Sequence, residues 1–329
     1  MQGSSPMEAQ PPVAPTRSTR LLRGLVKVLL ALLLIWPLTL GVVYLVNETY
    51  TALDPTRFPL SSSRVERLLA ALPADPTEPQ KGATLALAMV NRLEEELDSR
   101  LGWSVNDLWL SPTRWLDNRA NRQRGVIFAT RMLTAFFATH LAKYGTVDAE
   151  NEWLKEAREK RFAFTEDSWW LPSSESEFRK GIDLVRRYAN GLRDGKSVYN
   201  VRTDDVYNLL VYMLGPQFID QPLGLLVQAT EQVPYTELDD RIYYTQGVVL
   251  VLRDFLHAFA RLYPWIGEKG GGENLKIAFQ EMERICTFDP LVVLRGRHDS
   301  IMADHRGKMA SYLISMRERL NDLAQSIRR

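Results

Sequence analysis

Six charged residues recur in this sequence as two matched triplets. The triplets are Asp117, Arg119 and Arg131, and, displaced by 122 positions, Asp239, Arg241 and Arg253. In each, the aspartate and the last arginine are about four α-helical turns apart, so the three side chains lie on or near one edge of a helix. Such edges could form a symmetric site for an anion or another polar ligand. The alternative is a repeated helix start, with the aspartates favoured by the helix dipole and the arginines in packed salt bridges.

The histidines give no metal signature. They are His140, His257, His298 and His305. The first two fall inside apolar helical segments, where a core or boundary histidine is the ordinary expectation. The other two lie in RGRHDSIMADHRG with Asp299 and Asp304, but they are seven positions apart, whereas helical metal motifs place their ligands four apart. We therefore predict no metal site.

Three common catalytic and cofactor motifs are absent. The chain has no P-loop, no dinucleotide-binding glycine pattern and no Gly-x-Ser-x-Gly elbow. Its single cysteine, Cys286, is spaced among Met282, Ile285 and Phe288 as a small core residue would be. We predict no cofactor, and the sequence names no catalytic residue.

Trp169 and Trp170 form the most prominent aromatic pair. Acidic residues precede the pair, and Leu171 and Pro172 follow it. If exposed, the two side chains would suit a groove on a partner protein or the lipid interface; the alternative is core packing beneath a loop between helices.

One apolar stretch predicts on which side of a membrane the rest of the chain lies. Residues 28–46 contain no charge and are long enough to cross a bilayer core about 30 Å thick. No small-residue cleavage site follows, so we predict a retained signal anchor over 20–47. Arg17, Arg20, Arg23 and Lys27 precede it, which predicts a cytoplasmic N-terminus and a bulk on the other side, the periplasm in a bacterium. We expect residues 28–46 to bind the protein to the inner membrane.

The net charge of +1 hides a small asymmetry. The residues before Val28 carry about +3, which leaves the large remainder slightly acidic. A nearly neutral segment has no basic field for nucleic acid, so we predict no nucleic-acid partner.

Every periodic segment after the anchor is helical, which predicts an all-α fold. Residues 1–19 read as a disordered tail and 48–80 as a membrane-proximal linker containing a short helix that begins at Ser63. Further helices are expected at about 113–144, 148–162, 174–193, 203–214, 236–263, 273–285 and 300–327.

Segments 112–138 and 234–260 align without a gap. Nine of the twenty-seven aligned pairs are identical, including Pro112 with Pro234 and Gly125 with Gly247. Shared apolar period explains matched Val, Phe and Ala, but not matched Pro, Asp, Arg and Gly. We therefore predict a tandem duplication. Residues 81–195 and 196–329 would be two repeats of about four helices each, related by a pseudo-twofold axis, with the long helices in close contact at the two glycines.

The chain also resembles a known family. The motifs are LDNRANRQRGV at 116–126, DGKSVYNVRTDDVYNLL at 194–210 and ELDDRIYYTQGV at 237–248, after the anchor. They resemble an uncharacterised family of bacterial inner-membrane proteins known only as a domain of unknown function. The resemblance implies a bacterial, mainly proteobacterial, origin and a periplasmic bulk, and it implies no activity.

Taken together, these features favour a non-catalytic interaction or scaffold protein of the cell envelope. It would bind another envelope protein, or itself, through an exposed apolar or aromatic surface. The alternative is a periplasmic enzyme, or a lipid- or ligand-binding module, with a pocket between the two repeats.

Overall fold

The computed structural model describes most of the chain. The described residues are 17–53, 63–99, 101–108, 111, 117–143, 149–228, 233–234, 237–268, 271–290, 293–294, 296 and 301–328. They form helices and no strand, which confirms the all-α class. The α-helices are α1 (Arg17–Leu53), α2 (Ser63–Ala70), α3 (Glu78–Asp98), α4 (Asp117–Phe136), α5 (Glu152–Glu156), α6 (Ser174–Arg193), α7 (Thr203–Leu214), α8 (Asp220–Val227), α9 (Leu238–Leu262), α10 (Trp265–Glu268), α11 (Gly272–Cys286) and α12 (His305–Arg328). Two π-helical turns, η2 (Phe137–Leu141) and η3 (Ala157–Arg161), extend α4 and α5.

The chain divides into two compact units, Met1–Thr49 (unit 1) and Tyr50–Arg329 (unit 2). Within unit 1, α1 is long and apolar enough to cross a membrane over Leu21–Thr39, which overlaps the predicted span 28–46. The helix continues to Leu53, into the segment expected to be a linker. Its end agrees with Pro55, because the residue before a proline is disfavoured in the α conformation.

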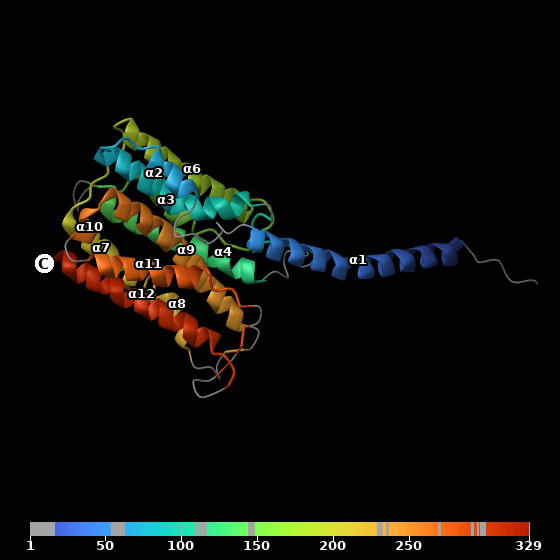
Figure 1. The fold of residues 1–329 in the computed structure, drawn as a ribbon. Coiled ribbons are helices and arrows are strands. Elements are labelled where there is room, and N and C mark those ends of the chain that lie inside the picture. The colour runs from blue at the N-terminus through green and yellow to red at the C-terminus, as the bar shows by residue number, and fades with distance from the viewer. Residues whose placement is uncertain are drawn as a thin grey trace, which may run out of the picture. The chain divides into compact units, whose positions relative to one another are not determined.

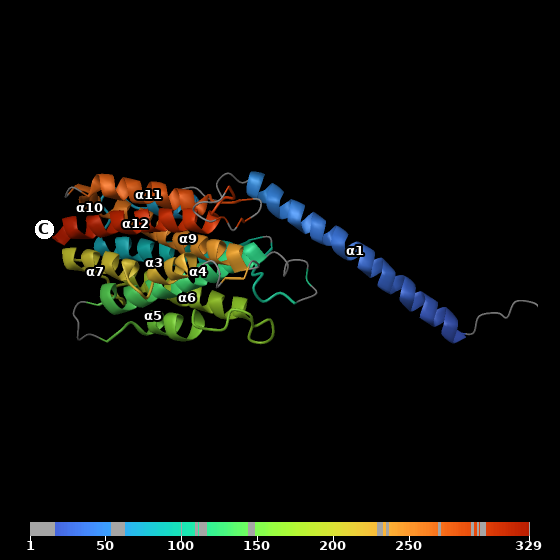
Figure 2. The same cartoon turned by 90° about the horizontal axis from the view of Figure 1, so that it is seen from below.

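Helix α9 is the centre of unit 2. All residues from Thr245 to Leu256 are buried, so α9 is covered on every side rather than along one stripe. Figures 1 and 2 show α4 beside it, running in the same direction, and α3 and α6 on one side of this pair. On the other side, α11 and α12 pack on each other, and α12 also packs on α7 and α8.

Gly125 and Gly247 are the point at which α4 and α9 touch. A Cβ at Gly125 would fall on the carbonyl oxygen of Tyr244 and crowd the amide of Val248. A Cβ at Gly247 would meet Arg122 and Val126 in the same way. The close helix contact predicted from the two glycines is confirmed.

The backbone contacts at this crossing have a local twofold relation. The offset of 122 carries Arg122 to 244 and Val126 to 248, so each glycine meets the counterparts of the residues that the other glycine meets. These contacts are consistent with the predicted pseudo-twofold axis at the crossing of α4 and α9. The duplication of the complete repeats stays a prediction.

Helix α2 belongs to the core of unit 2. Val65 is fully buried, Arg64 lies 3.1 Å from Asp98 at the end of α3, and Glu66 contacts His257 of α9 at 2.8 Å. Helix α3 also starts earlier than the predicted repeat boundary at 81. The part of 48–80 that the structure describes from Ser63 onward is thus integrated with the helices that follow.

Candidate functional site

Arg119, near the start of α4, contacts both α3 and the segment that follows α3. Its side chain is almost fully buried, donates to the carbonyl of Gly102 at 2.8 Å, and lies 3.3 Å from Glu96 of α3. Gln123, one turn further along α4, donates to the same carbonyl and accepts the amide of Ser104. Arg119 and Gln123 therefore bind the segment that follows α3 to the first turns of α4.

Arg241 has the same structural role at the start of α9. It donates to the carbonyl of Leu225 at 2.9 Å and to the side-chain oxygen of Gln228, both around the end of α8. The matched arginines therefore tie preceding segments to the long helices. This geometry supports the repeated helix-start interpretation for Arg119 and Arg241.

The matched aspartates lie close together where α4 and α9 begin. Asp117 is exposed, whereas Asp239 and its neighbour Asp240 are partly buried, and Asn121 of α4 donates to Asp240. Burial, reinforced by Asp239 and Asp117, raises the pKa of Asp240 to about 6. The pKa of Asp239 is also raised, chiefly by burial.

Arg253 and Arg131 occupy different environments. Arg253 is fully buried, and its guanidinium lies 3.0 Å from the carboxylate of Asp254, which is fully buried as well. Arg131 is exposed on α4. The six predicted residues therefore do not converge on one site. Four of them lie at the starts of α4 and α9, Arg253 forms a buried ion pair, and Arg131 is exposed.

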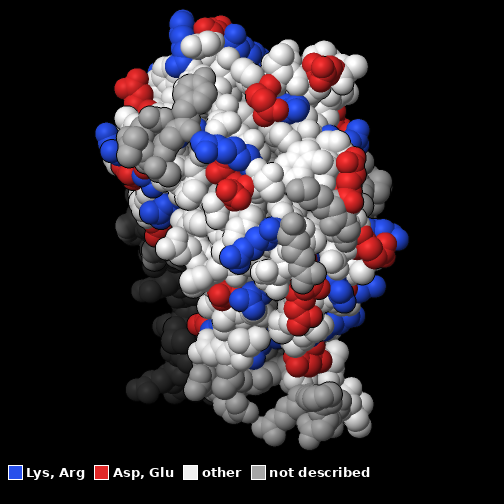
Figure 3. Space-filling view, turned by 90° about the vertical axis from the view of Figure 1, so that its left-hand side faces the viewer, with Lys and Arg blue, Asp and Glu red and all other residues white. Residues whose placement is uncertain are grey.

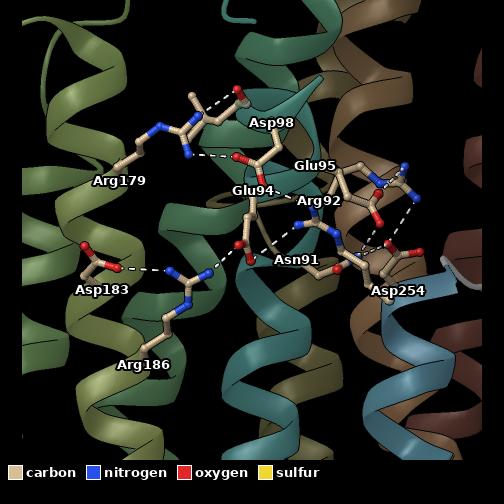
Figure 4. Close-up of polar contacts among 11 residues, drawn as sticks. Asn91, Arg92, Glu94, Glu95, Asp98, Arg179, Asp183, Arg186 and Asp254 are labelled. Atoms are coloured by element: carbon tan, nitrogen blue, oxygen red, sulfur yellow. Dashed lines mark hydrogen bonds and ion pairs between the residues drawn. The ribbon is translucent and has the colours of Figure 1, made fainter. Parts of the chain in front are cut away.

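The buried ion pair continues into α3. Figure 4 shows Arg92 and Asn91 reaching Asp254 from α3, with the Arg92–Asp254 distance at 3.1 Å. Burial opposes the charge of Arg92, but the carboxylates of Asp254, Glu95 and Glu96 outweigh it and raise the pKa of Arg92 above its ordinary value. Sequence reasoning missed this cluster, although Arg92 and Asp254 each interrupt an otherwise apolar helix face.

Figure 4 also shows an outer set of ion pairs between α3 and α6. Arg179 reaches Asp98 at 2.8 Å, and Arg186 bridges Glu94 and Asp183. These pairs are solvent-exposed, so each contributes about 1 kcal/mol or less. They align α6 along α3, and none of these charged residues lines the pocket described next.

A pocket of about 420 Å³ lies beside α4. Its apolar lining includes Phe128, Phe162 and Phe164, and its charged lining includes Arg131 and Glu166. Burial raises the pKa of Glu166, while Arg124, 3.6 Å away, opposes that rise. All of the lining residues fall between 105 and 167, so this pocket lies within the first predicted repeat rather than between the two.

Trp169 and Trp170 are exposed, so the core-packing alternative is wrong. Their exposed fractions are 55% and 67%, and Leu171, which sequence reasoning did not single out, is 85% exposed. The two rings pack edge to face, with 5.2 Å between their ring centroids. The adjacent Leu171 could have been found from its place beside the pair.

The loop that carries the tryptophans is held by hydrogen bonds at both ends. Ser174 donates to the carbonyls of Thr165 and Ser168, and Asn106 donates to the carbonyl of Ser168 at 3.0 Å. Trp103, which is buried, donates to the carbonyl of Glu166. The apolar side chains at the tip are therefore presented from a fixed base.

The cysteine and the histidines considered in the sequence analysis make contacts that are typical of structural residues. Cys286 is fully buried, as predicted, and burial raises the pKa of its thiol to about 11. His305 accepts the amide of Leu294, and His140 stacks on Phe136. Within the described ranges no three His, Cys, Asp or Glu side chains could hold a metal ion; His298 lies outside those ranges.

Comparison with known proteins identifies the family. Residues 23–229, more than half of the chain, match a family described as "Uncharacterized protein conserved in bacteria (DUF2333)". The chain belongs to this family. The match covers the predicted anchor from residue 23 onward and all of the first predicted repeat, and it ends before α9. No curated protein and no solved structure matches the chain. The family is conserved in bacteria, as the resemblance implied, and it has no assigned activity.

Proposed function

We propose that this bacterial protein is anchored in the inner membrane by α1 and acts in the periplasm as a non-catalytic interaction protein. The observation that carries the proposal is the exposed surface formed by Trp169, Trp170 and Leu171 on a hydrogen-bonded loop. Exposed aromatic clusters of this kind are typical of binding surfaces, because they bury a large area with little loss of side-chain freedom. We call these three residues the tryptophan tip.

The anchorage and its orientation rest on the first part of the chain. Helix α1 is apolar over Leu21–Thr39, and four basic residues lie close to the start of this helix and none beyond Lys27 within it. Basic residues stay on the cytoplasmic side of a single-pass anchor. In spheroplasts, added protease should therefore reach the region after α1. Protection of that region in intact spheroplasts would contradict the orientation.

The interaction function is tested by purification from solubilised membranes. The full chain and its Trp169→Ser/Trp170→Ser variant should differ in what co-purifies after cross-linking in cells, including cross-linked copies of the chain itself. A matched control is Val211→Ser/Ile314→Ser, because these two residues are also exposed but lie on the sides of unit 2. Cross-links that are the same in all three proteins would remove the tryptophan tip as the interaction surface.

The pocket beside α4 supports a second candidate, a ligand-binding module. The lining combines three phenylalanines with two basic residues, Arg124 and Arg131, and with Glu166 and Asp167. Arg124 lies 3.6 Å from Glu166, so Arg131 is the basic residue we assign to an anionic ligand with an apolar body. Arg131→Gln should then abolish any ligand-dependent rise in Tm of the full chain, without changing the Tm of the unliganded protein. The tryptophan tip remains the favoured site because more than half of each of its three apolar side chains is exposed.

A further inference from the structure

The exposed large apolar side chains of unit 2 are concentrated at one end. Nine such residues are found among its described residues, namely Leu108, Trp169, Trp170, Leu171, Val211, Val227, Ile301, Met302 and Ile314. All except Val211 and Ile314 lie where α4, α6, α9 and α12 begin and where α3 and α8 end. We call this the apolar end.

Contacts between the loops place these residues at the same end. Leu108 follows Asn106, which binds the loop of the tryptophan tip. Val227 ends α8, and the next residue, Gln228, is held both by Arg241 at the start of α9 and by Arg306 at the start of α12. Ile301 and Met302 directly precede α12. Four different loops thus contribute apolar side chains, and they surround the starts of the two central helices.

The opposite end of unit 2 has a different surface. Figure 3 shows that end, on which acidic and basic side chains are interspersed. It carries the C-terminal residues of α12 and the start of α7, and none of the nine exposed apolar residues described above. The asymmetry is therefore between two ends of one folded unit.

The first helix that packs in the core of unit 2, α2, begins at the apolar end. Helix α2 begins at Ser63, and the adjacent Arg64 is paired with Asp98 at the end of α3. The nine residues between α1 and α2 can span at most about 30 Å, and the part of α1 beyond Thr39 adds about 20 Å. An anchor in the bilayer therefore keeps Ser63, at the apolar end, within about 50 Å of the membrane surface, whichever way unit 2 turns.

We propose that the tryptophan tip inserts into the interface of the bilayer that α1 spans. This inference rests on the proposed membrane anchorage and names lipid as the partner of the proposed interaction surface. Tryptophan prefers the headgroup region, where its ring meets acyl chains and its N–H stays hydrated. The apolar residues come from four loops spread over one end, and among the described residues none of them lines the pocket beside α4, which suits a broad lipid surface better than a peptide or a helix.

The charges around the tip define the type of lipid contact. Glu166 and Asp167 precede the tryptophans, and Arg124 lies 3.6 Å from Glu166, so this loop has no excess of positive charge that would attract it to an anionic surface. Insertion is therefore driven by burial of apolar area and does not depend on anionic lipid. Phosphatidylcholine alone suffices, and added phosphatidylglycerol weakens the contact or leaves it unchanged.

The test uses the full chain in phosphatidylcholine vesicles. Cys286→Ala removes the native thiol, and Leu171→Cys then accepts an environment-sensitive NBD label at the tip. Lys196→Cys provides the matched control, because its exposed side chain follows the end of α6 at the opposite end of unit 2. The label at position 171 should emit at shorter wavelength and lose most of its emission to doxyl-labelled lipid, whereas the label at 196 should do neither. Adding Trp169→Ser/Trp170→Ser should restore most of the emission at 171.

Each outcome separates the inference from the proposed function. Equal, weak quenching at 171 and 196, in protein that floats with the vesicles, would overturn the lipid contact and leave the anchorage standing. A label at 171 that is shielded in detergent and unquenched by lipid would assign the tip to a second copy of the chain. Failure of the protein to float with the vesicles would overturn the anchorage itself.

Discussion

Asp254 balances the charge at the contact between α3 and α9. It accepts hydrogen bonds from Arg92 and Arg253, and all three side chains are almost fully excluded from water. One nitrogen of Arg253, Nη1, has no hydrogen-bond partner among the described residues. Removing the carboxylate would therefore take from the buried guanidinium of Arg253 its ion pair with Asp254, and would leave Arg92 with its contact to Glu95 at 3.0 Å.

Asp254→Asn should lower the free energy of unfolding by about 3–5 kcal/mol, as expected when one partner of a buried ion pair is removed. Asp183→Asn is the control, because Asp183 pairs with Arg186 at the surface and its loss should cost about 1 kcal/mol or less. Urea unfolding followed by circular dichroism measures both. Similar effects of the two substitutions would show that the buried cluster carries no special weight.

Asp240 makes stability depend on pH at the helix starts. Its pKa is raised from an ordinary value of 3.8 to about 6, so the folded protein holds this proton more tightly than the unfolded chain does. Stability from this group is therefore fully present below about pH 4 and is lost as the pH rises through 6. Asp239, Asp117 and Glu237 reinforce the rise, and Arg124 opposes it.

Asp240→Asn should consequently raise Tm near neutral pH and change it little below pH 4, since the amide oxygen can still accept the hydrogen bond from Asn121. The measurement is the difference in Tm between variant and wild type across this range of pH. A difference that does not vary with pH would mean that the ionised carboxylate of Asp240 is not destabilising.

At the scale of the helices, the α4–α9 crossing depends on two glycines. Their neighbours are backbone atoms, which cannot move aside as a flexible side chain could. This contact explains why a glycine is present inside each helix, where it costs about 1 kcal/mol relative to alanine.

Gly125→Ala and Gly247→Ala should each destabilise the protein by about 1–3 kcal/mol, because the new methyl group forces the helices apart. Gly224→Ala in α8 is the matched control: nothing lies within 4 Å of the added atom, and the substitution should stabilise by about 0.5–1 kcal/mol. Thermal melts of the three variants test the contrast. Stabilisation by alanine at either crossing position would contradict the close approach.

At the scale of the whole molecule, the boundary of the folded unit lies before α2. Val65 is buried in the same core as α3 and α9, and Glu66 contacts His257. A fragment that begins at Lys81 would lose α2 together with the first turn of α3, including Glu78, which accepts a hydrogen bond from Tyr263.

A fragment that begins at Ser63 should therefore melt cooperatively and at a higher temperature than one that begins at Lys81. Truncation exposes apolar surface on α3 and α9, and each fully buried apolar side chain is worth about 1.5–3 kcal/mol. Size-exclusion chromatography and thermal melts compare the two fragments. Equal Tm values would show that α2 contributes nothing to the fold.

The sequence alone determined the class and many of the elements. Apolar residues at helical spacing predicted helices at 174–193 and 203–214 with the bounds that α6 and α7 have. The uncharged run after Lys27 indicated the candidate span, because length and apolarity are local properties of the chain. The matched glycines likewise predicted a close helix contact, since only a close neighbour justifies the loss of a side chain.

Burial and partnership were decided by the tertiary structure. Arg131 and Arg253 match in sequence, yet one is exposed and the other is buried against Asp254, because the helices that cover α9 leave α4 open on one side. Trp169 and Trp170 could equally have been core residues, since an aromatic pair in a loop has no periodicity to reveal which way it faces. Their exposure, and the gathering of apolar residues from four loops at one end, depends on where distant segments meet in space.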